Sequence, residues 1–314
     1  MELRQCRYFV AVVDAMNITR AAHKLHVVQS AVSHQVARLE DELQATLLER
    51  TRSGVVPTEA GRLLYVHAQA ILKHVQVARE SIRALHDEVC GTVAIGLPSS
   101  TAAVLAVPLL KEVRARLPQV LLSVSEGLGN VLADELARGA LDVSILFDQF
   151  DNEPLRRFKR LPLVKERMHF VCALPQAKSA LARRTSVTLA EVARWPLILP
   201  PHNNSVRTLV DREAQRRDVR LTVVGELSGV KTILDAVEAG IAGALMMAAN
   251  AGALSRRKGV LVVPIRNPVI ERTASLFQSE QFPSTPASDA VRALLLEVVK
   301  DLVARGLWEG AELV

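Results

Sequence analysis

The chain has 314 residues, of which 49% are hydrophobic and 23% are charged. This composition excludes a chain that is mostly disordered, and the length suggests two or so domains at about 150 residues each. The formal net charge of +6 permits an anionic partner but does not identify one.

The three cysteines, Cys6, Cys90 and Cys172, are odd in number and far apart. They predict neither a disulfide framework nor a zinc site, and they favour a reducing, cytoplasmic location. The first residues lack the pattern of a signal peptide, and the longest apolar run, 240–249, is too short to span a bilayer. We therefore expect no membrane association, no metal and no cofactor.

Residues 1–57 predict short helices followed by a hairpin. Apolar residues between Leu3 and Val13 recur at helical spacing, and Asn17 and Thr19 can cap a second helix. Two short helices joined near 25–28 form a helix-turn-helix, in which the second carries an apolar face of Val32, Val36 and Leu39. The Ser53-Gly54 pair after it indicates a small hairpin.

The helix that begins near residue 29 presents hydrogen-bonding side chains on its outer face. Glutamine pairs with adenine, arginine and histidine favour guanine, and serine reaches several base edges. Arg50 and Arg52 flank the hairpin and can reach phosphates or a minor groove. A helical protein-protein module with a solvated polar face is the alternative. The predicted DNA-contacting residues are Thr19, Arg20, Gln29, Ser30, Ser33, His34, Gln35, Arg38, Arg50 and Arg52.

A long helix is predicted from Glu59 to about residue 90. Its apolar residues follow steps of four and three over about three heptads, which favours a narrow seam against another helix. A dimeric coiled coil is therefore expected, and the alternative is one amphipathic helix packed on its own domain. The predicted seam residues are Leu64, Ala68, Ile71, Val75, Ala78, Ile82 and Leu85.

From residue 91 onward, strands and helices alternate, which predicts α/β lobes with a parallel sheet. A strand at 273–278 would return the chain to the first lobe. The expected boundaries are a DNA-binding domain at 1–58, a linker helix at 59–90 and a regulatory domain at 91–314. Its lobe I covers about 91–161 and 266–314, and lobe II covers about 162–265. Strands are expected at 92–97, 120–124, 141–147, 168–174, 196–199 and 221–226, and helices at 104–117, 128–138, 205–217, 230–239 and 286–305.

Two predicted helices begin with hydroxyl and amide side chains, after Pro98 and after His202. Ligands of two-lobed sheets bind at the carboxyl ends of strands between the lobes, and unpaired amides at helix starts attract anions. Each such residue can instead simply cap its helix. An enzyme is the remote alternative, because Ser99, Ser100, Asp142 and His202 follow no catalytic motif. Redox sensing by Cys172 would need a partner thiol, and neither other cysteine is near in sequence.

Residues 1–61 strongly resemble the LysR-type transcriptional regulators. The similarity lies in Thr19-Arg20-Ala21-Ala22, Gln29-Ser30-Ala31-Val32-Ser33, Leu48-Glu49-Arg50-Thr51 and Thr58-Glu59-Ala60-Gly61, in order and without gaps. Segments such as 139–143 and 238–242 are similar to the effector domain of the same family. Within the family, Arg52 to Thr58, Thr101 to Ala103 and Gly225-Glu226 are most similar to the nitrogen assimilation control branch.

This resemblance implies an α+β protein with a winged helix-turn-helix, a dimerising linker helix and a two-lobed domain like periplasmic binding proteins. It also implies a dimer of dimers that binds an interrupted inverted repeat in double-stranded DNA, activates or represses transcription and contacts RNA polymerase. The family's DNA contacts correspond to Gln29, Ser33, His34 and Arg52. A small-molecule co-inducer would bind the cleft residues Ser99, Ser100, Thr101, Gly127, Leu128, Phe147, Asn203, Asn204 and Ser205.

Three positions depart from the family pattern. Ser30 replaces a common proline, His34 replaces a common arginine, and Val28 replaces a capping serine. These departures bear on the operator sequence that the protein recognises and leave the expectation of DNA binding unchanged. The resembled branch contains members without a known effector, so a regulator controlled by its own abundance is the alternative to an effector-responsive one.

Replacing Gln29 or Arg52 by alanine is expected to weaken operator binding in two different ways. Loss of the Gln29 base contact costs about 1–3 kcal/mol and relaxes specificity at one position. Loss of the Arg52 phosphate contact weakens binding to all sequences. It also lowers by about one the slope of the logarithm of the binding constant against the logarithm of the salt concentration. Titrations of operator and mismatched DNA at several salt concentrations measure both. A changed base preference in Arg52→Ala would show that the wing reads the groove.

Overall fold

The computed structural model describes residues 1–52, 54–84, 89–147, 158–181, 183–255 and 259–314. The chain divides into two compact units. The first contains Met1–Val89 with Glu280–Pro286, and the second contains Cys90–Ser279 with Ala287–Val314. Within the described part of the chain, no helix is both long and apolar enough to cross a membrane.

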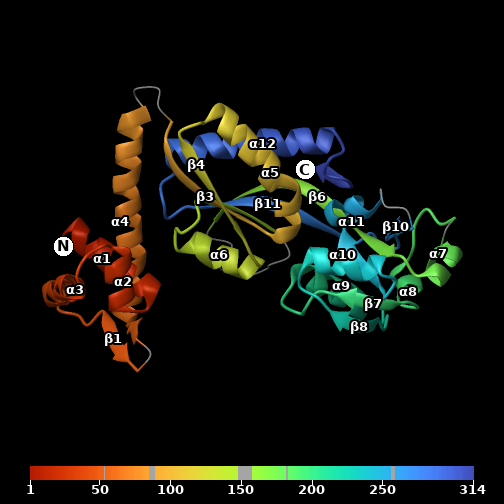
Figure 1. The fold of residues 1–314 in the computed structure, drawn as a ribbon, viewed down its shortest axis with the longest axis horizontal. Coiled ribbons are helices and arrows are strands. Elements are labelled where there is room, and N and C mark those ends of the chain that lie inside the picture. Colours follow the sequence, from red (N-terminus) through yellow and green to blue (C-terminus); the bar gives the residue numbers. More distant parts are fainter. Residues whose placement is uncertain (53, 85–88, 148–157, 182, 256–258) are drawn as a thin grey trace. The chain divides into compact units, whose positions relative to one another are not determined.

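The first unit begins with three helices around a small apolar core (Figure 1). They are α1 (Leu3–Ala15), α2 (Ile18–Lys24) and α3 (Gln29–Leu43). The Asn17 side chain accepts a hydrogen bond from the Arg20 N–H and so caps α2, whereas Val28 starts α3 without a side-chain cap. The predicted inner face of α3 is confirmed, because Val32, Val36 and Leu39 are buried against α1 and α2.

The predicted hairpin forms the wing, with β1 (Leu48–Thr51) antiparallel to β2 (Gly54–Pro57). Val55 N–H donates to the carbonyl of Met16 at 3.1 Å, which joins the wing to the turn between α1 and α2. Gly54 has a φ of +140°, and a Cβ there would lie 2.2 Å from the Met16 oxygen. Only glycine fits this close approach, so the wing is held in one place against α1.

Helix α4 (Glu59–Ala84) follows the wing and changes its surroundings along its length. Leu64 packs on the cluster of Phe9, Leu39 and Leu47, and Ala68 is fully buried. Ala68 is thus covered within its own chain, where α1 contacts α4, whereas Leu64 is half-buried and its place in the seam stays a prediction.

Farther along α4 the predicted seam is less covered by its own chain. Ile71 and Val75 are half-buried, Ala78 is exposed and Ile82 is 63% exposed. Leu85 lies outside the described residues. The free apolar surface that a partner helix could cover is thus at the C-terminal end of α4.

The second unit is built on two sheets that share one long strand, β6 (Phe158–Cys172). The residues up to Arg167 pair with β11 (Glu271–Ser279), and those from Met168 pair with β9 (Gly243–Met247) and β10 (Leu261–Pro264). The sequence predicted only the end of β6, because its first ten residues carry two runs of charged residues and Pro162, which do not follow the pattern of a buried strand. The predicted return strand is β11, which pairs with β5 (Val143–Phe147) of the first sheet.

In each sheet the parallel strands lie beside an antiparallel neighbour, which is β11 in the first lobe and β6 in the second. The expectation of a purely parallel sheet is therefore corrected. In the first lobe, β3 (Gly91–Leu97) lies parallel to β4 (Val120–Glu126) and to β5. In the second lobe, β7 (Pro196–Leu199) lies parallel to β8 (Thr222–Glu226) and to β9. β11 and β6 are antiparallel to their neighbours because the chain crosses between the lobes along them.

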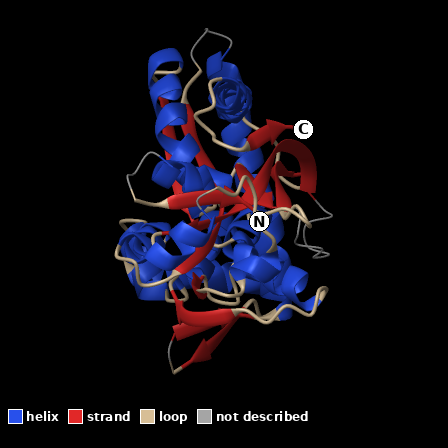
Figure 2. Cartoon of the chain, turned by 90° about the vertical axis from the view of Figure 1, so that its right-hand side faces the viewer, coloured by secondary structure: helices blue, strands red, loops and turns tan. Residues whose placement is uncertain are grey.

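Helices pack on the strands of both lobes (Figure 2). In the first lobe, Arg116 of α5 forms an ion pair with Glu297 of α12, and α6 packs on β5. The apolar core of the second lobe gathers around Phe170, Leu197 and Met247. The helices are α5 (Ser99–Arg116), α6 (Gly129–Ala137), α7 (Pro175–Leu181), α8 (Leu189–Val192), α9 (Ser205–Gln215), α10 (Val230–Glu238), α11 (Ala248–Ser255) and α12 (Pro286–Ala304).

Ile82→Asp is expected to disrupt dimerisation, because it places an unpaired charge in an apolar helix seam, at a cost of several kcal/mol. Leu63→Asp is the matched control, since Leu63 is 64% exposed and lies on α4 outside the seam. Size-exclusion chromatography with light scattering measures the mass of each variant. If Ile82→Asp remains dimeric at the concentration at which the parent does, α4 is not the dimer interface.

Candidate functional site: a DNA-reading helix and a cleft around Arg272

The exposed face of α3 carries most of the residues predicted to contact DNA. Gln29, Ser30, His34 and Arg38 are exposed, and the Gln29 amide donates to the Ser33 hydroxyl at 3.2 Å. That bond holds two predicted base-reading groups one helical turn apart on the same face. Thr19 and Arg20 at the start of α2, and Arg50 and Arg52 of the wing, are also exposed.

Gln35 is the exception within this group. It lies beside Arg4 and Tyr8 of α1 in a shallow groove, and its Oε1 atom is buried without a hydrogen-bond partner among the described residues. This oxygen is therefore closed to a base edge. The same groove includes Ser30 and His34 of the predicted DNA-contacting face, and a contact through the Gln35 amide nitrogen stays a prediction.

A second feature is a cavity of about 100 Å³ between the two lobes of the second unit. Four helix starts contribute to its wall, those of α5, α6, α9 and α10, and the ends of β5 and β9 supply apolar side chains. The carboxyl ends of parallel strands meet here, which is where two-lobed sheets bind ligands. The volume is well below the roughly 300–1,000 Å³ of drug-sized sites, so only a small molecule fits.

Most residues predicted for the cleft line this cavity. They are Ser99, Ser100, Gly127, Leu128, Phe147, Asn204 and Ser205. Thr101 and Asn203 are not among the lining residues. Thr101 is fully buried within the lobe, one position farther along α5, and the Asn204 side chain caps α9 by accepting from the Val206 N–H. The structure therefore corrects the cleft assignment of Thr101 and Asn203.

Arg272 of β11 is the central residue of the cavity, and the sequence did not single it out. Its Nε and Nη2 both lie 2.8 Å from Oε2 of Glu166 on β6. Nη2 also donates to the Ser100 hydroxyl at 2.9 Å, and Nη1 donates to the Ser205 hydroxyl at 3.4 Å. One guanidinium thus joins the first turn of α5 in one lobe to the first turn of α9 in the other.

The environment of Arg272 is almost entirely dry, since the residue is 3% exposed. Burial lowers the pKa of its guanidinium, and the neighbouring Glu166 carboxylate opposes that shift. The Cζ atom lies 3.4 Å from the centroid of the Phe147 ring, a cation–π contact. Among the described residues that line the cavity, Arg272 alone carries a charge. The sequence signal that could have found Arg272 is its spacing of two and four residues from Ala274 and Leu276, which places a charged side chain on the buried face of β11.

Glu166 is fully buried and both of its oxygens receive hydrogen bonds. Oε2 accepts from Arg272, and Oε1 accepts from the indole N–H of Trp308 at 2.9 Å. A buried carboxylate with both oxygens satisfied and a cation beside it meets the conditions under which a buried ion pair is tolerated.

The loop that carries Asn204 and Ser205 is held by a second arginine. Arg207 donates to the Pro200 carbonyl at 3.1 Å and to the carboxylates of Asp211 and Glu226 at 2.9 and 2.7 Å. It is 6% exposed, so these contacts are largely shielded from water. The start of α9 is therefore held in place by contacts within its own chain.

The residues considered for an enzyme or a redox sensor have other partners. Asp142 accepts from the backbone N–H of Ala94 at 2.8 Å, and His202 contacts Asp211 and Arg207. Cys172 is buried, and burial raises the pKa of its thiol, which disfavours the reactive thiolate. The geometry assembles neither a catalytic triad nor a reactive thiol from these groups.

Comparison with known proteins defines the class to which this fold belongs. Residues 3–62 match the model of the bacterial regulatory helix-turn-helix proteins of the lysR family, and residues 86–300 match the LysR substrate binding domain. The chain belongs to the LysR family of transcriptional regulators.

The relatives support the branch indicated by the sequence. The chain is 33% identical to the nitrogen assimilation regulatory protein nac of Klebsiella aerogenes, over 100% of this chain and 99% of the relative. It is 31% identical to the protein of the same name from Escherichia coli strain K12, over 96% and 97%.

Solved structures agree in fold at lower identity. A full-length variant of OxyR from Pseudomonas aeruginosa has a TM-score of 0.75 at 24% identity, covering 96% of this chain and 95% of that one. Full-length CbnR complexed with its target DNA has a TM-score of 0.61 at 20% identity, covering 96% and 99%.

Arg272→Met and Glu166→Gln are each expected to destabilise the second unit, because each leaves one buried charge without its partner. Removing one member of a buried pair costs about 3–5 kcal/mol. The double variant should lose less than the sum of the two single losses, since no lone charge remains. Chemical unfolding of the parent, the two single variants and the double variant measures the free energy of unfolding lost by each variant. Additive losses would mean that the two charges do not interact.

Proposed function

We propose that this regulator binds an interrupted inverted repeat as a dimer of dimers and that a small carboxylate in the inter-lobe cleft controls its effect on transcription. The observation that carries the ligand response is the single guanidinium that contacts both lobes inside the cleft. A ligand can shift an equilibrium between lobe arrangements only if it binds one of them better, and a contact shared by both lobes provides that difference.

On the DNA side, the proposal assigns α3 to the major groove and the wing to the backbone. Gln29, Ser33, His34 and Arg38 would read base edges, while Arg50, Arg52, Thr19 and Arg20 would contact phosphates. Support comes from the exposure of these residues, of which Ser33 is half-buried, and from a solved structure of similar fold in complex with its target DNA. Two-fold operators match dimers whose half-sites lie about one helical turn or its multiples apart.

On the ligand side, the cleft combines hydroxyl donors, one arginine and an apolar wall. Ser99 and Ser228 are exposed hydroxyls on opposite lobes, and Ile233, Leu245 and Met247 form part of the apolar lining. Hydroxyl groups and a guanidinium stabilise a carboxylate, and the apolar wall accommodates a short carbon chain. With a cavity of about 100 Å³, these features favour a carboxylate of a few carbon atoms.

A second candidate is a regulator without an effector, controlled by its own abundance. It is favoured by the fact that Arg272 satisfies its hydrogen bonds with Glu166, Ser100 and Ser205 of its own chain. Catalysis is not proposed, because the relatives are transcriptional regulators and the groups considered for a triad have other partners. Contact with RNA polymerase and a cytoplasmic location belong to the proposal as consequences of acting on promoters.

Propionate is expected to raise the unfolding midpoint of the full-length protein, and the neutral isostere propionamide is expected to raise it much less. A ligand at a hundredfold excess over its Kd stabilises by about 2.7 kcal/mol. Ser99→Ala with Ser228→Ala should reduce the propionate shift, because the double variant removes one hydroxyl from each lobe without touching Arg272. Ser123→Ala, an exposed serine of β4 outside the cavity, is the control.

Operator binding is measured in parallel on the same proteins. If neither propionate, acetate nor butyrate moves the midpoint while operator binding is intact, the effector-independent candidate replaces the ligand response. Equal shifts with propionate and propionamide would contradict the proposed charge selectivity.

A further inference from the structure

The segment after α12 folds back onto β6. Trp308 is 1% exposed, and its backbone N–H and that of Leu307 both bond to the carbonyl of Leu302. Gly310 has a φ of +65°, and a Cβ there would lie 2.4 Å from Cβ of Ala248, at the start of α11. This close approach requires glycine and lets the last residues reach the sheet.

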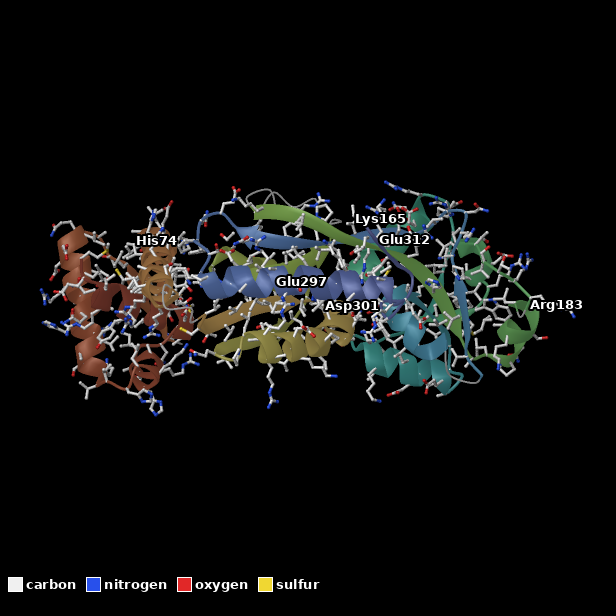
Figure 3. The ribbon with its side chains drawn as sticks, turned by 90° about the horizontal axis from the view of Figure 1, so that it is seen from above. His74, Lys165, Arg183, Glu297, Asp301 and Glu312 are labelled. Atoms are coloured by element: carbon white, nitrogen blue, oxygen red, sulfur yellow. The ribbon has the colours of Figure 1, made fainter. Side chains whose placement is uncertain are left out.

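The chain then forms β12 (Ala311–Leu313), which pairs antiparallel with Val164–Glu166 of β6. Lys165 and Glu312 face each other in this register and are labelled in Figure 3. The Arg167 guanidinium also lies 3.0 Å from the Glu312 carboxylate. The C-terminal segment is therefore fixed to β6 by backbone and side-chain contacts, not by Trp308 alone.

Glu166 lies on β6 between the C-terminal segment and the strand that carries Arg272. It is the cross-strand partner of Arg272 on β11 and of Ala311 on β12. Because cross-strand partners share a face, the Glu166 and Arg272 side chains meet there. Trp308 completes the arrangement by donating to the other carboxylate oxygen at 2.9 Å.

We propose that Trp308 is a positioning residue of the cleft: through Glu166, it fixes the orientation of Arg272 and thereby the hold of the guanidinium on Ser100 and Ser205. Without the indole N–H, Oε1 of Glu166 is a buried acceptor with no donor, and the carboxylate rotates to find one. Because Oε2 accepts from Nε of Arg272 and lies 2.8 Å from its Nη2, that rotation displaces the guanidinium. The regulatory meaning of this link rests on the proposed function of the cleft, but the link itself does not.

Hydrogen exchange of the full-length protein tests the link without any ligand. The first turns of α5 and α9 contain the bonds from Ala102 N–H to Pro98 O and from Thr208 N–H to Asn204 O. Trp308→Phe is expected to speed exchange of these two amides about tenfold, the effect of losing one buried hydrogen bond. The first-turn amide of α10, from Ile233 to Gly229, should not change, because the polar contacts of Arg272 within the described residues go to Glu166, Ser100 and Ser205.

Trp195→Phe is the matched control, since Trp195 is the other tryptophan and packs, half-buried, against the core of the second lobe. It should leave the amides of Ala102 and Thr208 unchanged. Glu166→Gln keeps the side-chain volume and should speed exchange of the Ala102 and Thr208 amides relative to that of Ile233, and this ratio separates the local effect from the loss of overall stability expected for the variant. Unchanged exchange in both cleft variants, or an equal change in the Trp195 control, would overturn the proposal.

The ligand measurement separates this inference from the proposed function. If propionate binds the parent, Trp308→Phe is expected to raise the apparent Kd about tenfold, in line with the same lost bond. Altered exchange without propionate binding would support the positioning role and contradict the carboxylate response. Propionate binding with unaltered exchange would support the carboxylate response and contradict the positioning role of Trp308.

Discussion

The buried ion pair between Arg272 and Glu166 is the constraint on which the second unit depends. The two residues lie on β11 and β6, the strands along which the chain crosses between the lobes. A charge at the junction of two lobes is tolerated only when every polar atom around it has a partner. That requirement brings together Ser100, Ser205 and Trp308, so the geometry of the cleft follows from satisfying one guanidinium and one carboxylate.

The same requirement links regions that have separate roles. The Ser100 and Ser205 hydroxyls belong to helix starts that line the cleft, while Trp308 belongs to the C-terminal segment. A rigid network of this kind responds as a unit, because moving one member leaves another unsatisfied in a low-dielectric site. A small ligand that competes for Arg272 would therefore act on both lobes at once.

The DNA-binding unit follows a different logic, in which local contacts dominate. The recognition face is formed by neighbouring residues of α3, and the wing is fixed by one backbone bond to Met16 that only Gly54 permits. Its specificity lies in exposed side chains that make few contacts within the chain, as Gln29 does with Ser33. Such a surface can change its base preference by substitution without loss of the fold.

The sequence by itself determined what depends on local pattern: the helix-turn-helix, the exposed face of α3, the hairpin and the starts of α6, α9 and α10, whereas α5 begins five residues before its predicted start. These are fixed by hydrophobic period and by capping residues close in the chain. Tertiary structure alone decided the burial of Ala68, the burial of the Gln35 Oε1 atom and the length of β6. It also assembled Arg272, Glu166 and Trp308. In the sequence, Arg272 is 106 residues from Glu166 and Trp308 is 142 residues from it. No spacing rule predicts such contacts, because they exist only once two lobes and a returning strand enclose the same dry volume.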